Sequence, residues 1–394
     1  MLIKKLFIFI FSVTAILTVP LFCYGYCEAD ISAESAIVIN ADTNEIIFEK
    51  NSSEKKTMAS TTKIMTCLLA VESGRISDKV TVSGKIHSDG SSVGLKEGNV
   101  LTLESLVYAM MLESGNDAAE VTAEFLSGSE ESFSHLMNKK ALEIGMANTN
   151  FVTASGLDSD EHYSTAHDMA LLGAYAVRNP VFRRFCSTDV KTVDFINPGY
   201  SVTFSNHNKL LRYCDGVFGI KTGFTKKSGR CLVSACERKG ITLICVTLNA
   251  PNDWDDHEIL YDTCFSALTS QNFDCGFSGS VRIYGSHKAV ITAESADDFY
   301  VFASLSDKKA EAQTVLQKII YAPVKAGDIL GETRIILNGK VIRTVPIIAR
   351  EDAMCIEGKQ QKKMNFIEKM IYKYKNRKEN FYDRRKSQAS EIPR

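Results

Sequence analysis

A change of pattern along the chain constrains its fold more than any other feature. Helical periodicity dominates residues 60–145, whereas strand-like runs dominate from residue 217 onward. Two short strand-like runs, at 36–39 and 46–49, precede the helical part. Helices are expected at 60–72, 103–112, 117–126 and 129–144, with Gly74 and Gly145 as stop signals. This order predicts an α+β fold, in which helices flank an antiparallel sheet.

The second half of the chain changes pattern again at about Gly276. Before this residue, strands are expected at 217–222, 231–236 and 241–248, followed by an amphipathic helix at 254–268. After it come short β-type runs, at 281–284, 289–292, 300–303, 319–322, 333–337 and 340–348. Asn338-Gly339 is a strong hairpin signal between the last two. We therefore expect a main domain over 30–275 and a small β-rich domain over 276–356.

The N-terminus has the pattern of a secretory signal. Lys4 and Lys5 precede an apolar run from Leu6 to Phe22, and small residues follow. Cleavage is expected after Gly25 or Ala29, so residues 1–29 are assigned to the signal. The alternative is an uncleaved membrane anchor, for which the run is short. The protein is therefore expected to be exported.

Charge and cysteine content exclude several classes of protein. A formal net charge of −1 argues against a nucleic acid or another polyanionic partner. Nine of the 11 cysteines remain after signal cleavage; they are scattered, odd in number and contain no Cys-x-x-Cys pair. Neither a disulfide framework nor a zinc site is expected, and most of these cysteines are predicted to be small buried residues.

Three short motifs carry the candidate chemistry. They are Ser60-Thr61-Thr62-Lys63, Ser114-Gly115-Asn116 and Lys221-Thr222-Gly223. Each alone is weak: a serine can cap a helix, and the two other triplets can be turn residues. Their order is that of the motif set of β-lactamases and penicillin-binding proteins. The three motifs together therefore predict a serine acyl-transfer site.

The first motif supplies a nucleophile and a base. Ser60 and Lys63 are three residues apart at the start of a predicted helix, so they share a face. The lysine amine can accept the serine proton only when neutral, which requires a lowered pKa. Burial and the nearby charge of Lys221 would both lower it. Ser60 is thus the candidate nucleophile and Lys63 the candidate general base.

The other two motifs offer groups for the substrate. Ser114 can relay a proton to the leaving amine, and Asn116 can hold a substrate amide. Lys221 and Thr222 suit the free carboxylate that ends a peptide. Gly223 lets a substrate backbone approach an edge strand. The oxyanion hole is expected to use the backbone N–H of Ser60 and another just after Gly223.

Other chemistries find little support in the sequence. His162 and His167 are five residues apart, which is not the one-turn spacing of a helical metal pair. A Ser-His-Asp triad would need a Gly-x-Ser-x-Gly elbow, and the sequence contains none. No metal and no cofactor are expected.

Longer blocks around the motifs resemble one family. Residues 58–66 (MASTTKIMT) look like the active-site stretch of the serine D-alanyl-D-alanine carboxypeptidases, the low-molecular-mass penicillin-binding proteins of peptidase family S11. Residues 217–225 (VFGIKTGFT) look like their third motif, and residues 151–157 and 162–170 resemble the stretch before it. The similarity runs from about Glu34 to about Glu357.

The resemblance implies a β-lactamase/transpeptidase-like domain followed by the β-rich domain. It also implies a Ser60 acyl-enzyme, a peptidoglycan stem peptide as substrate and covalent trapping by β-lactams. Two positions depart from the family. Phe224 follows Lys-Thr-Gly where many members carry histidine, and Ser155 precedes Gly156-Leu157 where some carry histidine. Both departures concern deacylation and substrate contact.

Three other functions remain open at the level of sequence. A β-lactamase shares the motifs, but residues 117–220 contain no Glu-x-x-Leu-Asn-like deacylating element. A catalytically silent wall-binding protein would not need an intact Ser60, Lys63 and Lys221. A transpeptidase differs only in the acceptor, since water and amines compete for one acyl-enzyme.

The C-terminal segment 357–394 is strongly basic. Twelve lysines and arginines against five acidic residues give it a net charge of +7. Asn365 and Glu368 form a capping-box pattern, and an apolar face follows, made of Phe366, Ile367, Met370, Ile371 and Tyr374. We expect an amphipathic helix that lies on an anionic membrane surface, at the extracytoplasmic face of the cell membrane. The alternative is a solvated tail.

Overall fold

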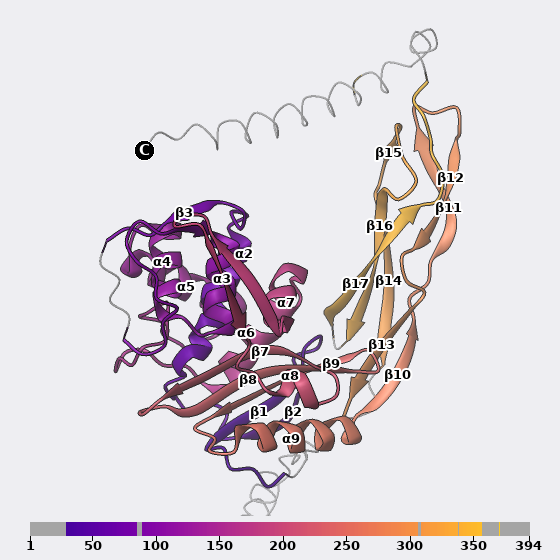
Figure 1. Cartoon of the computed structure of the whole chain (residues 1–394). Helices are drawn as coiled ribbons and strands as arrows, with labels where there is room; N and C mark the ends of the chain where they lie inside the picture. Colours follow the sequence, from indigo (N-terminus) through magenta and orange to yellow (C-terminus); the bar gives the residue numbers. More distant parts are fainter. Residues whose placement is uncertain (1–28, 85–88, 306–308, 338, 357–369, 371–394) are drawn as a thin grey trace, which may run out of the picture. The chain divides into compact units, whose positions relative to one another are not determined.

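The computed structural model describes residues 29–84, 89–305, 309–337, 339–356 and 370. The chain separates into two compact units, each coloured by residue number in Figure 1. The first extends to Gln271 and resumes at Val301, and the second takes in Asn272–Tyr300 and resumes at Lys309. The predicted signal up to residue 28 and nearly all of the basic tail lie outside the described residues.

A five-stranded antiparallel sheet forms the centre of the first unit, in the order β2-β1-β9-β8-β7. Its strands are β1 (Ser35–Asn40), β2 (Ile46–Lys50), β7 (Val217–Thr225), β8 (Gly229–Arg238) and β9 (Ile241–Leu248). The prediction of these five strands is confirmed, although four are longer than predicted. Because β7 pairs only with β8 in this sheet, it is an edge strand.

Helices cover both faces of this sheet, as the view in Figure 1 shows. They follow a 3-10 turn, η1 (Ala59–Thr62), and are α2 (Lys63–Glu72), α3 (Leu103–Leu112), α4 (Asn116–Ser127), α5 (Glu130–Ile144), α6 (Ala166–Val177), α7 (Pro180–Ser187), α8 (Leu210–Tyr213) and α9 (Asp253–Ala267). The predicted start of an α-helix at Ser60 is wrong by three residues, because η1 occupies 59–62. Helices α6, α7 and α8 were not predicted.

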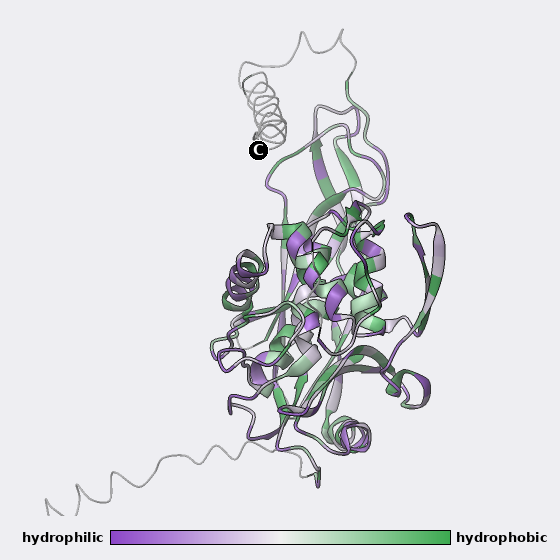
Figure 2. Ribbon diagram, turned by 60° about the vertical axis from the view of Figure 1, so that its left-hand side comes forward, coloured by the Kyte–Doolittle hydropathy of each residue, from purple (hydrophilic) through white to green (hydrophobic). Residues whose placement is uncertain are grey.

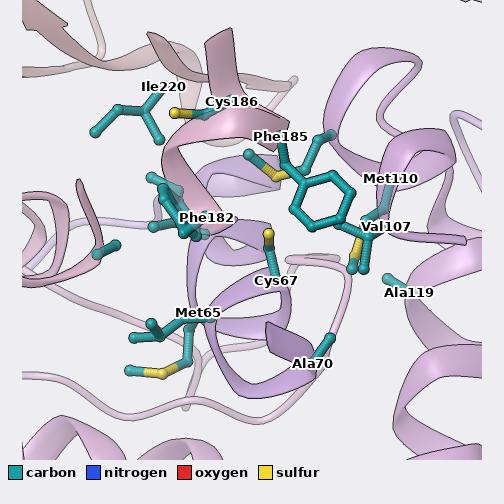
Figure 3. Close-up of a cluster of buried hydrophobic side chains, with 14 of the residues drawn as sticks. Met65, Cys67, Ala70, Val107, Met110, Ala119, Phe182, Phe185, Cys186 and Ile220 are labelled. Carbon is teal, nitrogen blue, oxygen red and sulfur yellow. The ribbon is translucent and has the colours of Figure 1, made fainter. Parts of the chain in front are cut away.

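Alternation along the strands divides the buried residues between two cores. Ile37 and Ile39 of β1 face the core shared with most of the helices, whereas Ala36 and Val38 face the core shared with α9. Hydrophobic stretches run along the sheet strands in Figure 2. Figure 3 shows part of the larger core, where α2, α3, α4 and α7 meet β7 at Ile220. The site therefore stands on a sheet that is buried on both faces.

Two small antiparallel sheets, each of two strands, complete the first unit. They are β3 (Lys79–Thr81) with β4 (Val100–Thr102), and β5 (Val190–Phe195) with β6 (Tyr200–Ser205). Eight of the nine cysteines in the described residues are free and buried, and the exception is the exposed Cys355. The prediction that most cysteines are small buried residues is confirmed.

The second unit is a β-structure with its own small core. Its six-stranded sheet has the order β14-β16-β17-β12-β11-β15. The strands are β11 (Ser278–Tyr284), β12 (Val290–Ser295), β14 (Ala310–Leu316), β15 (Ile320–Tyr321), β16 (Ile329–Leu337) and β17 (Lys340–Ala349). A further pair, β10 (Thr269–Asp274) with β13 (Phe299–Ser304), leads the chain from the first unit and back. Strand β14 was not predicted, whereas the hairpin at 338–339 is confirmed by the pairing of Leu337 with Lys340.

Candidate active site

The 3-10 turn η1 presents Ser60 at the floor of a cleft. The Thr61 hydroxyl donates to the carbonyl of Met58 at 2.6 Å, and the Thr62 hydroxyl donates to the carbonyl of Ala59 at 2.9 Å. Both threonines are fully buried, whereas Ser60 is partly exposed and lines the cleft. The two side-chain bonds thus fix the turn from below and leave the serine hydroxyl accessible.

Lys63, the first residue of α2, lies directly beneath Ser60. Its Nζ atom is 2.8 Å from Ser60 Oγ, 2.7 Å from Asn116 Oδ1 and 2.6 Å from the carbonyl oxygen of Ser155. The lysine side chain is fully buried. Three separate segments of the chain therefore converge on one amine.

The contacts of Lys63 and its burial act together on the protonation of its amine. The amide oxygen of Asn116 and the carbonyl oxygen of Ser155 can only accept, so they take two N–H groups. The third partner, Ser60 Oγ, belongs to a hydroxyl, which can accept a proton from the amine or donate one to the lone pair of a neutral amine. Burial lowers the pKa of Lys63 well below its usual range, and the charge of Lys221 lowers it further. The lowered pKa therefore favours the neutral amine that a general base needs.

Asn116 and Asp117 begin α4 and fix the second motif. The Asn116 Nδ2 group donates to the carbonyl of Asp89 at 2.5 Å, so both ends of this amide are engaged within the protein. The carboxylate of Asp117 accepts from the backbone N–H groups of Val93 and Leu95 and from the Ser92 hydroxyl. Asp117 thus ties the loop 91–95 to α4. Sequence reasoning missed this residue, although it directly follows the motif.

Lys221 lies behind the cleft rather than in it. Its side chain is 1 % exposed, and its Nζ donates to the carbonyl of Thr222 at 2.9 Å. Burial lowers the pKa of Lys221 to about 7. Its proximity to Lys63 explains the additional lowering there. The structure thus brings the third motif close to the first.

Gly223 permits the close approach of β7 to the nucleophile turn. A Cβ atom at this position would lie 3.0 Å from the backbone nitrogens of Ser60 and Thr61, and 3.1 Å from the carbonyl oxygen of Met58. Contacts of this length are tighter than nine in ten real Cβ contacts, so a side chain here would require the turn to move by a few tenths of an ångström. Close packing of β7 against η1 is therefore a structural reason for glycine, beside the predicted approach of substrate.

The cleft above these residues has a volume of about 500 Å³. Ser60, Ser114, Thr222, Gly223 and Phe224 line it, together with parts of the segment 205–212 and the group Arg230, Asp253 and Trp254. Ser114 has a φ of 62° and is largely buried, so its backbone occupies a left-handed conformation at the cleft wall. Phe224 is 65 % exposed at the rim. The predicted residues Lys63, Asn116 and Lys221 support the cleft from below.

A buried histidine, His162, supports the nucleophile turn. His162 Nδ1 accepts from the backbone N–H of Val152 at 3.0 Å, so Nε2 carries the proton and donates to the Thr62 hydroxyl at 2.9 Å. This links the loop before Ser155 to the nucleophile turn. The contact of Ser155 with Lys63 uses its main-chain carbonyl. It is therefore unaffected by the departure from histidine at this position.

Two buried histidines predict a pH-dependent stability of the first unit. Burial lowers the pKa of His162 to about 4 and that of His257 to about 3, against about 6.5 when exposed. The unfolded chain binds these protons near pH 6.5 and the folded chain does not. Stability is therefore complete above pH 6.5 and falls as the pH decreases towards 4, by up to about 3 kcal/mol for His162.

Urea unfolding followed by Trp254 fluorescence measures this slope, because Trp254 is the only tryptophan and lies in α9. Between pH 4.5 and 7, we expect the free energy of unfolding of the His162→Gln variant to change less with pH than that of the wild type. The exposed His135 provides the matched control, as His135→Gln should leave the slope unchanged. Equal slopes for the wild type and His162→Gln would contradict the account.

A serine hydroxyl, a buried lysine amine of lowered pKa beside it and an accessible cleft define an enzyme of serine acyl transfer. Among the described residues, no group of histidine, cysteine and acidic side chains is arranged to hold a metal ion. Comparison with known proteins agrees with this class. A family model described as D-alanyl-D-alanine carboxypeptidase matches residues 25–252, and one described as the C-terminal domain of penicillin-binding protein 5 matches residues 270–353.

Individual relatives extend over both units. The D-alanyl-D-alanine carboxypeptidase DacF of Bacillus subtilis is 31% identical over 81% of this chain and 85% of its own length. DacC of Escherichia coli is 31% identical over 82% of this chain and 84% of its own. The solved structure of penicillin-binding protein 5 from Haemophilus influenzae has a TM-score of 0.58 at 26% identity, covering 83% of this chain and 99% of that one. The chain belongs to the D-alanyl-D-alanine carboxypeptidase family.

Proposed function

We propose that this protein removes the terminal D-alanine from peptidoglycan stem pentapeptides through an acyl-enzyme on Ser60. The observation that carries the proposal is the position of Lys63 Nζ, 2.8 Å from Ser60 Oγ with its two other contacts satisfied by fixed acceptors. Family membership supports the substrate, because the matching model and relatives are described as D-alanyl-D-alanine carboxypeptidases.

In the first half of the reaction, Ser60 attacks and the terminal D-alanine leaves. Lys63 accepts the hydroxyl proton as Oγ bonds to the carbonyl carbon of the penultimate D-alanine. Backbone N–H groups of Ser60 and Phe224 stabilise the oxyanion. Ser114 passes the proton to the leaving amine as the peptide bond breaks. An ester on Ser60 remains, and free D-alanine departs.

In the second half, water hydrolyses the ester and restores the serine. Lys63 takes a proton from the attacking water and returns it to Ser60 Oγ as the ester breaks. Thr222 and Gly223 bind the substrate along β7, whereas Asn116 and Lys221 act from below by orienting Lys63 and lowering its pKa. A β-lactam enters the same sequence and is expected to remain as a stable adduct, because its ring-opened product stays in the cleft.

The test compares two turnover rates of the purified protein. We expect D-alanine release from a stem pentapeptide to be catalytic, and penicillin to inactivate it with turnover slower by orders of magnitude. Rapid release of hydrolysed penicillin without D-alanine release would instead identify a β-lactamase. Absence of both turnovers and of any covalent adduct would identify a silent wall-binding protein.

We further propose that the protein is exported and binds the extracytoplasmic surface of the cell membrane. The basic start and apolar run of residues 1–29 support export, and the +7 charge and apolar face of residues 357–394 support an interfacial anchor. Within the described part of the chain, no helix has the length and apolar character needed to cross a bilayer. The division into a signal, a catalytic domain over 30–275, a β-rich domain over 276–356 and a tail belongs to the same proposal.

Removal of the tail is expected to abolish membrane binding without loss of activity. Each basic residue near an anionic surface contributes about 1 kcal/mol, and the apolar face adds a salt-resistant part. The mature full-length protein should therefore float with anionic vesicles. High salt should reduce the bound fraction without eliminating it. A protein that ends at Glu357 should not float, yet should hydrolyse small peptides at the full rate. Equal flotation of the two proteins would contradict the anchor.

A further inference from the structure

The proposed reaction needs a cation that faces the cleft. A carboxypeptidase binds a free terminal carboxylate, and the sequence assigned this carboxylate to Lys221 and Thr222. Thr222 lines the cleft, but the Lys221 amine is 1 % exposed and already donates to the carbonyl of Thr222. A buried amine of this kind supplies positive potential without direct contact. Another residue must therefore complete the carboxylate site.

The register of β7 and β8 brings Arg230 to the cleft. Phe224 pairs with Arg230 and Gly223 with Cys231, so Arg230 lies one residue pair from the strand position that contacts Ser60. Directly opposed residues of an antiparallel pair project from the same face. Arg230 and Phe224 therefore share the face opposite to that of Gly223, and both line the cleft. A peptide along the edge of β7 would meet Ser60 on one side and Arg230 on the other.

A buried carboxylate orients the Arg230 side chain. Its Nε and one terminal nitrogen donate to Asp253 Oδ1, at 2.8 and 2.7 Å, and the Asp253 side chain is 2 % exposed. The guanidinium carbon also lies 5.2 Å from the ring centre of Trp254. Of the five N–H donors, two are thus used. The three other N–H donors lie on the two terminal nitrogens and have no partner among the described residues. Two of these donors, one on each terminal nitrogen, lie side by side at the end of the guanidinium group.

The other basic side chains at the cleft are held less firmly by their neighbours. Arg212 makes a similar pair with Asp189, but both side chains are about half exposed, at 51% and 47%. Lys209 is exposed, and His207 is half exposed beside Glu113. Arg212 also belongs to α8 rather than to the strand beside the nucleophile. Rigid anchoring and strand register therefore distinguish Arg230.

We propose that Arg230, held by Asp253 and Trp254, binds the terminal carboxylate of the substrate and makes the enzyme specific for free C-termini. A planar guanidinium with a free end-on pair of donors matches a carboxylate bidentately. Thr222 contributes a hydroxyl from the same wall. This inference rests on the proposed carboxypeptidase function. It assigns selectivity to a residue outside the three motifs.

The test measures selectivity with matched peptides. We expect the wild type to prefer a stem peptide with a free terminal carboxylate over its C-terminal amide. Arg230→Gln should reduce this preference in kcat/KM by at least about tenfold, mainly through KM, and Arg230→Lys should recover part of it. Because Arg230→Gln leaves Asp253 buried and unpaired, the double variant with Asp253→Asn provides a second measurement free of that defect.

Further measurements distinguish failure of this inference from failure of the proposed function. Arg238→Gln, on the same strand and paired with Asp262, should leave selectivity unchanged. Acylation of Ser60 by a penicillin and by its methyl ester reports the same carboxylate contact without any peptide hydrolysis. Unchanged selectivity in both Arg230 variants, or a loss in Arg212→Gln instead, would overturn the assignment. Absence of D-alanine release by the wild type would overturn the proposed function alone.

Discussion

Replacement of Ser60 by alanine will abolish release of D-alanine from a stem pentapeptide, by roughly 10⁴-fold or more in kcat. The variant lacks the oxygen that forms the ester, and the lysine amine beneath it has no other hydroxyl within its described contacts. The residual rate would come from binding alone. Measurement of D-alanine release at saturating peptide checks the result.

The same variant should keep the native fold. The contact of Ser60 Oγ with Lys63 Nζ is modest in energy, so the free energy of unfolding should change by about 1 kcal/mol or less. Ser53→Ala is the matched control, because Ser53 is an exposed serine in the turn before the motif. Its activity should equal that of the wild type. Activity of Ser60→Ala within tenfold of the wild type would remove Ser60 as the nucleophile.

Replacement of Lys63 by methionine should lower kcat by about 10² to 10⁴, the range for loss of a general base. Methionine keeps the apolar stem in the buried site but cannot accept a proton. Lys63→Arg should be equally inactive, because a guanidinium does not lose its proton in proteins. Since burial and Lys221 lower the pKa of Lys63, wild-type activity should fall only as the pH decreases through that lowered pKa. A normal lysine would instead restrict activity to alkaline pH.

Lys226→Met gives the control for the loss of a lysine. Lys226 is exposed in the turn between β7 and β8, and the variant should retain full activity. Unfolding of Lys63→Met should be measured in parallel, because Asn116 and the Ser155 carbonyl lose a donor, at a cost of about 1–3 kcal/mol. If kcat of the folded Lys63→Met variant stays within tenfold of the wild type, another group is the base.

The sequence was sufficient for the parts of the site that depend on local geometry. The spacing of Ser60 and Lys63 predicted a shared face, and their atoms lie 2.8 Å apart even though a 3-10 turn precedes the helix. Both a 3-10 turn and an α-helix bring residues three apart to one side. The lowered pKa of Lys63 also followed from burial beside Lys221, as the structure shows.

Residues whose role depends on register could not be found in this way. Strand β8 was predicted from residue 231, one position after Arg230, although it begins at Gly229. Only the pairing of Phe224 with Arg230 places that side chain at the cleft. His162 likewise gains its role from contacts with Thr62, 100 residues away, and with the backbone of Val152, 10 residues away.

The failure to predict α6 and α7 has identifiable physical reasons. α6 is apolar nearly all round, with nine of its twelve residues buried, so its sequence lacks the one-sided periodicity of a surface helix. α7 does carry a start signal, since Asn179 caps it and Pro180 occupies its first turn. The start of α7 is therefore encoded in its local sequence.

The most direct test of the account is to locate the covalent adduct. The mature protein is incubated with a penicillin, digested, and analysed by peptide mass spectrometry. We expect one penicilloyl group per chain, on the peptide that contains Ser60, and none on the Ser60→Ala variant. An adduct on a different residue, or one that persists in Ser60→Ala, would contradict the acyl-enzyme mechanism.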